Sequence, residues 1–407
     1  MSIDDLRFVR EDFPMLQKQL HGRQVVYLDS AATSQKPLAV IEAMDRFYRE
    51  DYATVHRAVY ELAAASTDAY SAVREQVRQF LNAQKTEEVL FTRGTTESIN
   101  LVASSYGKAF IQPGDEVVIS TIEHHSNIVP WQLLCEDRGA RLRVIPVDDS
   151  GVLDLDAYRA LLNEKTRIVA VNHIANSLGT INPIQEMASY AHAAGAHILV
   201  DGAQAAPHMV VDVQALDADF YVFSGHKALG PTGIGVLYGK ESLLEEMPPY
   251  QGGGDMIERV SFEKTTYNSL PLKFEAGTPM IVEVIGLGAA IQYLQQVGLE
   301  RIHEWEGLLL EQATRKIQAL PNVKLLGTAP SKGAILSFIV EGAHPLDVGT
   351  FLDLRGICVR TGHHCAQPTM ERFGVTASSR ASFAFYNTPE EVDYFIESLE
   401  QVVQQLV

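Results

Sequence analysis

The sequence predicts an α/β fold, in which a large domain with a mostly parallel central sheet is joined to a smaller α+β domain. Apolar strand-like runs alternate with helical segments across residues 88–223, and such alternation is typical of a parallel sheet covered by helices on both faces. Beyond about Val282, long helical segments and short strands replace this pattern. With 407 residues, 46% of them hydrophobic and 21% charged, the chain is long enough for two domains.

The N-terminal region predicts three short elements. Residues 3–13 place apolar side chains on one helical face before Pro14, which indicates a short amphipathic helix that packs on the smaller domain. Residues 25–29 read as a strand, and a helix with an apolar side begins at Pro37. Residues 55–57 (Val-His-Arg) read as a solvated loop.

A strand, a glycine-containing turn and a helix follow one another from Glu88. The turn reads Arg-Gly-Thr-Thr at residues 93–96, and the helix shows apolar residues with i, i+3, i+4, i+7 spacing. The free N–H groups of a helix N-terminus bind anions, and the hydroxyls of Thr95 and Thr96 add donors. Taken alone, such a threonine more often caps the helix; beside a phosphate-bearing cofactor it indicates a phosphate site.

Further strands are expected at regular intervals, and polar residues follow several of them. Ligands in such sheets bind at the carboxyl ends of the strands. The expected strands cover residues 116–120, 142–145, 168–172, 198–201 and 220–223.

The C-terminal region predicts a helix from Val284, a break at Gly298 and a long helix over residues 299–320. Short strands are expected at 323–326, 335–339, 357–360 and 380–383, with helices at 346–354 and 389–405. We therefore predict a large domain over residues 20–285 and a small domain formed by residues 1–19 and 286–407.

Charge and cysteine content limit the binding partners and the cellular compartment that we expect for this protein. A net charge of −18 argues against nucleic acid or an anionic membrane as a partner, since those are bound through clustered lysine and arginine. Three cysteines, Cys135, Cys358 and Cys365, are too few for a disulfide scaffold and indicate a reducing compartment. The sequence shows neither a signal peptide nor a membrane-spanning run, so we expect a cytoplasmic protein.

Two strand ends carry an acid and an amine. Asp201 ends the strand His-Ile-Leu-Val-Asp, and Lys227 follows the strand Phe-Tyr-Val-Phe in the turn Ser-Gly-His-Lys. A lysine in a strand-end loop is usually a solvated surface residue, but in a desolvated pocket its pKa falls and it can form a Schiff base. Pyridoxal 5'-phosphate needs such an amine for its aldehyde and an aspartate for its ring nitrogen.

A second reactive group is Cys365, which lies between His363, His364 and Pro368 in a glycine-containing loop. Positive charge from Arg360 favours its thiolate, whereas Cys135 and Cys358 read as inert buried thiols. Zinc bound by His363, His364 and Cys365 is the competing interpretation. We expect no metal, because adjacent ligands in one short loop, without a second Cys/His cluster, suit zinc geometry poorly.

These motifs carry a resemblance that runs along almost the whole chain. Val-Asp-Gly-Ala-Gln at 200–204 and Ser-Gly-His-Lys at 224–227 resemble the class V branch of the fold-type-I pyridoxal-phosphate transferases. The short loop Arg-Thr-Gly-His-His-Cys at 360–365 is similar to that of the Suf-type cysteine desulfurases. The resemblance implies that L-cysteine is converted to L-alanine, with the sulfur left as a persulfide on Cys365 and passed to a small acceptor protein for iron–sulfur cluster assembly.

The same resemblance implies roles for further residues. His124, rather than His125, stacks on the cofactor ring and takes part in proton transfer, while Gln204 meets the phenolic oxygen. Ser224 and His226 complete the phosphate cradle, and Thr278 reaches the phosphate of the neighbouring protomer, which implies a homodimer. Arg360 and Arg380 suit a carboxylate, because a guanidinium offers a planar fork of donors. With Asn176 they complete the expected substrate site.

Three other interpretations stay open on the sequence. A selenocysteine lyase shares the cofactor residues and depends less on the loop thiol. An aminotransferase of the same fold needs a keto acid instead. A protein that keeps the fold without catalysis would bind no cofactor through Lys227.

Overall fold

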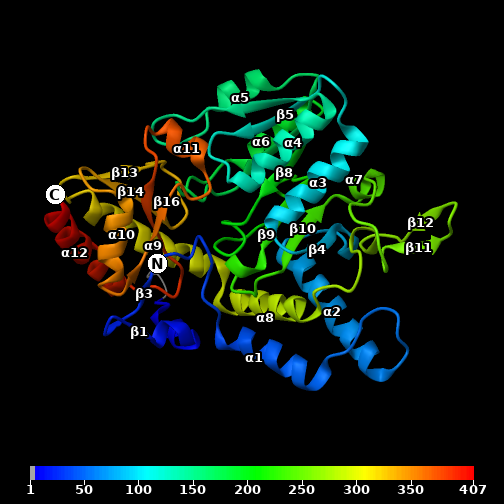
Figure 1. The fold of residues 1–407 in the computed structure, drawn as a ribbon, viewed down its shortest axis with the longest axis horizontal. Coiled ribbons are helices and arrows are strands. Elements are labelled where there is room, and N and C mark those ends of the chain that lie inside the picture. Colours follow the sequence, from blue (N-terminus) through cyan, green and yellow to red (C-terminus); the bar gives the residue numbers. More distant parts are fainter. Residues whose placement is uncertain (1–4) are drawn as a thin grey trace.

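The computed structural model describes residues 5–407, and residues 3 and 4 of the predicted N-terminal helix lie outside the described residues. Figure 1 shows a large domain built on a central sheet, with a smaller domain, coloured orange and red, beside it. The seven strands of the central sheet are, in spatial order, β4 (Val89–Thr92), β10 (Gly235–Gly239), β9 (Phe220–Ser224), β8 (His197–Asp201), β7 (Thr166–Asn172), β5 (Glu116–Ser120) and β6 (Arg141–Ile145).

All neighbouring strands of this sheet run parallel except those that flank β10, which is antiparallel to both β4 and β9. The mostly parallel α/β fold is therefore as predicted. The helices of this domain are α1 (Leu38–Arg46), α2 (Glu61–Phe80), α3 (Thr95–Phe110), α4 (Val129–Arg138), α5 (Leu155–Leu161), α6 (Ile184–Ala193), α7 (Glu241–Glu246) and α8 (Ile281–Val297).

The strands are buried on both faces, and alternate residues enter two different cores. On β9, Phe220 and Val222 pack in the core that also holds residues of α3 and α4, whereas Tyr221 and Phe223 pack in the core that holds residues of α2 and α8. Side chains alternate because successive Cβ atoms of a strand point to opposite faces. Burying each such side chain stabilises the fold by roughly 1.5–3 kcal/mol. The sheet is consequently a rigid platform for the loops at its carboxyl edge.

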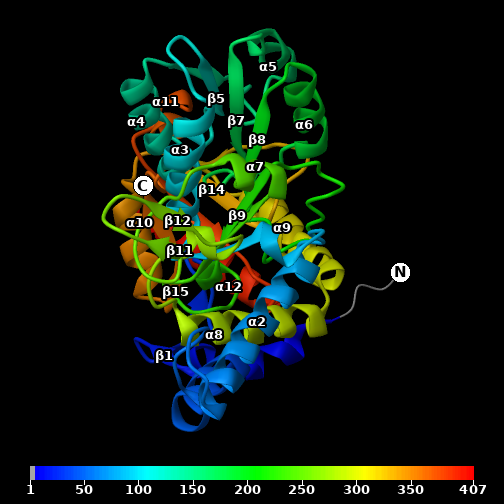
Figure 2. The same ribbon diagram turned by 90° about the vertical axis from the view of Figure 1, so that its right-hand side faces the viewer.

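The small domain is a four-stranded antiparallel sheet with helices around it (Figure 2). Its strands are β13 (Val323–Leu326), β14 (Ile335–Val340), β17 (Ser378–Ser382) and β16 (Arg360–Gly362), in that spatial order. Its helices are α9 (Leu299–Ile317), α10 (Pro345–Asp353), α11 (Gln367–Arg372) and α12 (Pro389–Leu406). The predicted boundary at residue 285 falls within α8, and the division into domains stays a prediction.

Several expected elements differ in the structure. The N-terminal segment forms two 3₁₀ turns, η1 (Arg7–Asp12) and η2 (Pro14–Gln17), instead of an α-helix. Pro14 has no N–H and holds Phe13 in an extended conformation, which interrupts the helical hydrogen bonds. The strand expected over 357–360 divides into β15 (Ile357–Cys358), which pairs with β3 (Val26–Tyr27), and β16, which pairs with β17.

Several elements have no counterpart among the predicted ones, including β1 (Gln19–Leu20), β2 (Arg23–Gln24), α7 and α11. Helix α2 carries buried residues at Ala63, Tyr70, Val73 and Val77, a spacing that fits a helical stripe in an alanine-rich sequence. Strand β10 is short and has a glycine at each end. The hairpin β11 (Ile257–Val260) and β12 (Thr265–Tyr267) projects from the large domain in Figure 1.

None of the described helices is long and apolar enough to cross a bilayer.

Candidate active site

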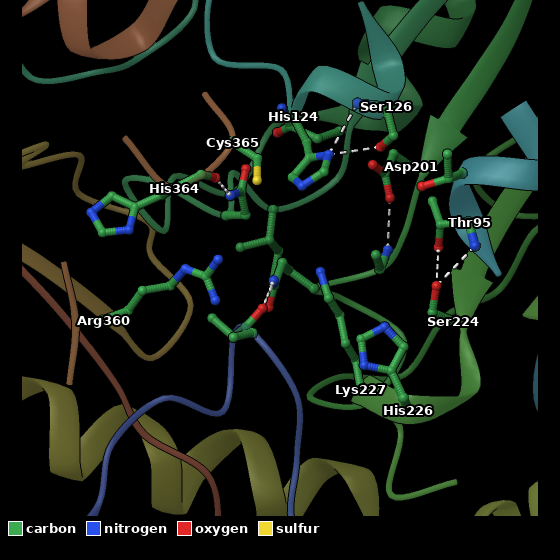
Figure 3. Close-up of a pocket in the computed structure, with 18 of the residues that line it drawn as sticks. Thr95, His124, Ser126, Asp201, Ser224, His226, Lys227, Arg360, His364 and Cys365 are labelled. Carbon is green, nitrogen blue, oxygen red and sulfur yellow. Dashed lines mark hydrogen bonds between the residues drawn. The ribbon is translucent and has the colours of Figure 1, made fainter. Parts of the chain in front are cut away.

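A pocket lies where the carboxyl ends of the central strands meet loops of the small domain (Figure 3). It contains every residue that the sequence predicts for the site except Thr278. The predicted residues that line it are Thr95, Thr96, His124, Asn176, Asp201, Gln204, Ser224, His226, Lys227, Arg360, Cys365 and Arg380.

Lys227 ends the 3₁₀ turn η6 (Gly225–Lys227) directly after β9, and its amine points into the pocket in Figure 3. Desolvation in the pocket lowers the pKa of Lys227 to about 8. This value includes a smaller lowering of the pKa by the cationic Arg380 and Arg360 and an opposing rise from Asp201 and Cys365. The amine is therefore much closer to its neutral, nucleophilic form at physiological pH than an ordinary lysine.

The turn that carries Lys227 is held by the loop that follows β3. The carbonyl oxygen of His226 accepts hydrogen bonds from Thr33 Oγ1 and Ser34 Oγ, both at 3.1 Å, and from Lys36 Nζ at 2.8 Å. Burial lowers the pKa of Lys36 to about 8. These contacts fix the backbone on the N-terminal side of Lys227.

Asp201 is the last residue of β8 and is 5% exposed. Its Oδ1 accepts the N–H of Ala203 at 3.0 Å. Burial raises the pKa of Asp201, an effect that Lys227 and the Ala203 hydrogen bond oppose. The same strand end positions Gln204, whose Nε2 donates to the carbonyl of Ala31 at 2.6 Å.

The N-terminus of α3 and the end of β9 meet where the sequence predicts a phosphate cradle. Ser224 Oγ accepts the N–H of Thr95 and lies 2.8 Å from Thr95 Oγ1. The backbones approach closely here, because a Cβ on Gly235 would lie 2.4 Å from the Cα of Gly94. Gly94 itself has φ +152°, which L side chains rarely adopt. Ser224, from another strand, thus binds the first N–H of α3, whereas the N-cap residue Gly94 has no side chain to cap the helix.

His124 precedes the 3₁₀ turn η5 (His125–Asn127), and its ring faces the pocket in Figure 3. Its Nδ1 accepts the N–H of Ser126 at 3.1 Å, so in the neutral ring the proton is on Nε2. Burial and the nearby Lys227 lower the pKa of His124 to about 3. The ring is therefore neutral at physiological pH.

Two arginines, Arg360 and Arg380, line the pocket, and they differ in whether their guanidinium groups already have hydrogen-bond partners. Arg380 is 1% exposed and donates to the carbonyl of Asn176 at 2.8 Å and to Asp29 Oδ1 at 3.2 Å. Among residues 5–407, the guanidinium of Arg360 has no hydrogen-bond or ion-pair partner, and it points toward the pocket in Figure 3. Arg360 is thus the cation that is more readily available to an anionic substrate.

The Cys365 loop has a strained backbone. His364 and Cys365 adopt φ values of +54° and +55°, the left-handed region that non-glycine residues avoid. Each such residue costs on the order of 1–2 kcal/mol. The loop is held by surrounding hydrogen bonds, among them Asn176 Nδ2 to the carbonyl of His364 at 2.7 Å and His364 Nε2 to Ser378 Oγ at 2.8 Å. Cys365 is half-buried, and its sulfur faces the pocket.

The metal-ligand set considered from the sequence is replaced by another in the structure. His364 turns away and is 3% exposed, while a nitrogen of His125, a nitrogen of His363 and Cys365 Sγ lie within 4.8 Å of one another. However, His125 Nε2 and His363 Nδ1 each accept a backbone N–H at 3.1 Å. In each neutral ring the proton must then lie on the other nitrogen, so neither ring offers a free lone pair for a metal.

The other two thiols differ from Cys365. Cys135 lies buried in α4 and Cys358 lies in β15, and burial raises the pKa of each to about 11. Both are thiols at physiological pH, outside the residues that line the pocket.

Thr278 lies in a neighbouring cavity, between the 3₁₀ turn η7 (Leu272–Phe274) and α8. Arg93 and Tyr250 line this cavity and also the outer side of the phosphate cradle. Its segment is anchored by Glu275, which pairs with Arg74 at 2.8 Å in the core.

Three supporting residues carry no sequence prediction. Asp29 pairs with Arg380, and Ser126 orients His124. Glu123 is fully buried and accepts the N–H of Asn172 at 3.1 Å and the amide of Asn127 at 2.7 Å. Only Ser126 had a local signal, since a serine two residues after a histidine can reach its ring; the other two depend on long-range contacts.

The donor set of this pocket fits pyridoxal 5'-phosphate. It offers an amine of lowered pKa for the aldehyde, a buried carboxylate for the ring nitrogen, and a helix N-terminus with hydroxyls for the phosphate.

Comparison with models of protein families shows to which family this chain belongs. The model of the aminotransferase class-V family matches residues 26–395. The chain belongs to the class-V aminotransferase family. The cofactor of this family is pyridoxal 5'-phosphate, which confirms the predicted cofactor and fold.

Curated relatives share about half of the sequence. The chain is 53% identical over 398 residues to a cysteine desulfurase of Synechococcus elongatus and 51% identical over 398 residues to one of Cronobacter sakazakii. It covers 98% of the Cronobacter protein. It spans only 64% of the length of the Synechococcus relative, and 66% and 59% of two mycobacterial relatives described as probable cysteine desulfurases.

Solved structures agree with this relationship over the whole chain. The Escherichia coli cysteine desulfurase CsdA, in an S-sulfonic acid form, superposes with a TM-score of 0.92 at 41% identity, and each chain is covered completely. The apo cysteine desulfurase of Thermococcus onnurineus superposes with a TM-score of 0.94 at 41% identity, again with complete coverage of both chains.

Proposed function

We propose that this protein is a cysteine desulfurase, which converts L-cysteine to L-alanine and leaves the sulfur as a persulfide on Cys365. The observation that carries the proposal is that Lys227 and Cys365, from different domains, line one pocket. A nucleophilic amine and a nucleophilic thiol in one pocket suit the removal of sulfur from an amino acid. The names of relatives about 50% identical along the chain support the same activity.

The cofactor would be held by residues of the large domain. Thr95, Thr96, Ser224 and His226 would bind the phosphate, Asp201 the ring nitrogen and Gln204 the phenolic oxygen. His124 would cover the ring face, and Lys227 would bind the aldehyde carbon. When bound, pyridoxal 5'-phosphate supplies an aldehyde that condenses with amines and a protonated ring that withdraws electrons.

The substrate carboxylate would be bound by Arg360 and Arg380, with Asn176 beside them. Arg380 is already fixed by Asp29 and the carbonyl of Asn176, so it presents a rigid cation. Arg360 has no such partner among the described residues and is free to form the paired hydrogen bonds that a carboxylate accepts. The substrate thiol would then face Cys365.

Proton and sulfur transfer follow from the same arrangement. Lys227 Nζ, whose lowered pKa leaves a neutral fraction, removes the proton from the substrate α-carbon. The Cys365 thiolate attacks the substrate sulfur, forming an S–S bond while the bond between that sulfur and the β-carbon breaks. The β-carbon, left with the electron pair of the broken bond, takes up a proton, and protonated Lys227 returns its proton to the α-carbon, so that L-alanine and the Cys365 persulfide are formed without an external oxidant.

The persulfide sulfur would pass to a thiol of a small acceptor protein that serves iron–sulfur cluster assembly. The short Cys365 loop supports assignment to the Suf-type desulfurases. A homodimer, in which Thr278 reaches the neighbouring phosphate, and a cytoplasmic location belong to the same proposal. The sparse cysteines of the chain support a reducing compartment.

Mass spectrometry tests this function. After the holoenzyme is incubated with L-cysteine, we expect one added sulfur on the peptide that contains Cys365, and alanine in solution. Cys365→Ala should lower cysteine turnover at least a hundredfold, because the group that accepts sulfur is lost. Cys135→Ala is the matched control and should keep near-normal turnover, since that thiol lies outside the pocket.

The alternatives give different results in the same assay. Undiminished cysteine desulfuration by Cys365→Ala would contradict the proposal. Selenocysteine turnover that far exceeds cysteine turnover and survives the substitution would indicate a selenocysteine lyase instead. Activity that requires a keto acid would indicate an aminotransferase.

A further inference from the structure

His125 follows the pocket residue His124, yet it lies among the contacts of the Cys365 loop and outside the residues that line the pocket. Its backbone N–H donates to the carbonyl of Cys365 at 2.7 Å. Its ring Nε2 accepts the N–H of Gln367 at 3.1 Å. One residue of the large domain therefore binds the small-domain loop at the reactive cysteine and again two residues later.

The loop needs such contacts because of its conformation. His364 and Cys365 are consecutive non-glycine residues with left-handed φ, and only surrounding interactions can hold them there. A second imidazole acts in the same way, since His363 Nδ1 accepts the N–H of Cys365 at 3.1 Å. The rings of His125 and His363 lie with their centroids 5.5 Å apart. Two imidazole acceptors thus hold the backbone N–H groups of Cys365 and Gln367, two residues apart in the loop.

We propose that His125 is a positioning residue, which holds residues 363–367 in the strained conformation that directs Cys365 Sγ into the pocket. The inference rests on the proposed function, since it concerns the thiol that receives sulfur. His125 does not line the pocket, although a nitrogen of its ring lies within 4.8 Å of Cys365 Sγ. It acts through the backbone on the C-terminal side of Cys365, at the carbonyl of Cys365 and the N–H of Gln367.

The chemistry requires a neutral ring with an unprotonated Nε2. An imidazolium has only N–H donors and could not accept the Gln367 N–H. Burial and the neighbouring His363 lower the pKa of His125, which favours the required form. The bonded N–H is also the first of α11, a position that has no partner within its own helix.

Two variants distinguish the effect of losing the hydrogen-bond acceptor of His125 from the effect of losing the volume of its ring. Glutamine places Oε1 the same number of bonds from Cβ as Nε2 of histidine, so His125→Gln keeps an acceptor for Gln367. His125→Leu removes the acceptor and keeps an apolar side chain of moderate size. Both variants retain the backbone hydrogen bond to Cys365.

Amide hydrogen exchange measures the contact directly. In His125→Leu holoenzyme, we expect the peptide that covers residues 363–372 to exchange at least five times faster than in the unsubstituted protein, and His125→Gln should exchange nearly as slowly as the unsubstituted protein. His344→Leu is the matched control: His344 Nδ1 accepts the N–H of Leu346 at 3.2 Å at the start of α10. Its substitution should leave the 363–372 peptide unchanged.

Persulfide formation supplies the second readout. His125→Leu should form the Cys365 persulfide at least ten times more slowly with L-cysteine, while its visible absorbance shows normal cofactor content and His125→Gln restores the rate. Unchanged exchange in His125→Leu, or equal exchange in the leucine and glutamine variants, would overturn the positioning role. Absence of persulfide in the unsubstituted protein would instead overturn the proposed function and leave the exchange result standing.

Discussion

At the scale of single residues, burial sets the protonation states in the pocket. Desolvation lowers the pKa of Lys227 to about 8 and that of His124 to about 3. Both shifts favour the neutral form of a base, since a buried cation loses its hydration. Lys227 is therefore the pocket base that titrates nearest to physiological pH, while His124 stays neutral throughout the usual assay range.

The reactivity of Lys227 should follow this titration. Only the neutral amine attacks a carbonyl, so the rate of reductive methylation of Lys227 by formaldehyde in cofactor-free protein should rise about tenfold per pH unit below pH 8 and level off above it. Peptide mass spectrometry across pH 6–10 measures the rate. Lys264, which is exposed, provides an internal comparison in the same samples. A midpoint near the ordinary value of 10.5 would show that the pocket does not desolvate Lys227.

At the scale of elements, the site depends on strand ends that turn sharply beside a helix N-terminus. Strands β4 and β10 are neighbours, and Gly235 pairs with Thr92 directly beside the turn that begins α3. A side chain at Gly235 would meet backbone atoms of Gly94, which cannot move without displacing Thr95. The phosphate cradle therefore depends on the absence of a side chain on the adjoining strand.

Gly235→Ala should consequently lower the free energy of unfolding by about 1–3 kcal/mol, the usual cost of overpacking. Denaturant unfolding of the cofactor-free protein measures it. Gly307→Ala is the matched control, because Gly307 lies within α9 and no described atom lies within 4 Å of its added Cβ. That variant should be neutral or more stable by up to about 1 kcal/mol, since alanine favours helix. Equal effects of the two substitutions would contradict the close approach at Gly235.

At the scale of the whole molecule, the distribution of exposed apolar side chains supports the proposed homodimer. Val59 and Phe262 are essentially fully exposed, at 103% and 108%. Large exposed apolar residues also lie on α1, in the segment between α1 and α2, and on the β11–β12 hairpin. Such concentrations are typical of an interface, and they support the proposed homodimer.

Mixed dimers test whether Thr278 acts on the neighbouring site. If it does, a dimer of one Thr278→Val protomer and one Lys227→Ala protomer contains one complete site, and it should retain about half of the cofactor absorbance of the unsubstituted dimer. Thr278→Val homodimers should lose cofactor faster on dilution, because a phosphate contact is missing. Sedimentation analysis checks that both species are dimers. If Thr278 acts within its own chain, the mixed dimer should lose cofactor as fast as the Thr278→Val homodimer.

The sequence alone determined six of the seven central strands and the polar residues at their ends. Asp201 ends one buried strand and Lys227 ends the turn after the next. Parallel strands bring their carboxyl ends to one edge, so local patterns were sufficient to predict that the two would meet. Helix α2 escaped prediction although its stripe of buried residues is regular, because its alanine-rich sequence is weakly apolar. Strand β10 escaped because it is short and bounded by glycines.

Only the tertiary structure decided how the two domains share the pocket. Cys365 meets His125 across 240 residues, and Arg380 meets Asp29 across 351. No local periodicity encodes such contacts, since they depend on how loops of two separately patterned sheets pack together. The same packing directed the His364 ring to Ser378 and brought His125 to the cysteine loop. Local chemistry therefore indicated which residues could react, and long-range packing decided which of them share a pocket.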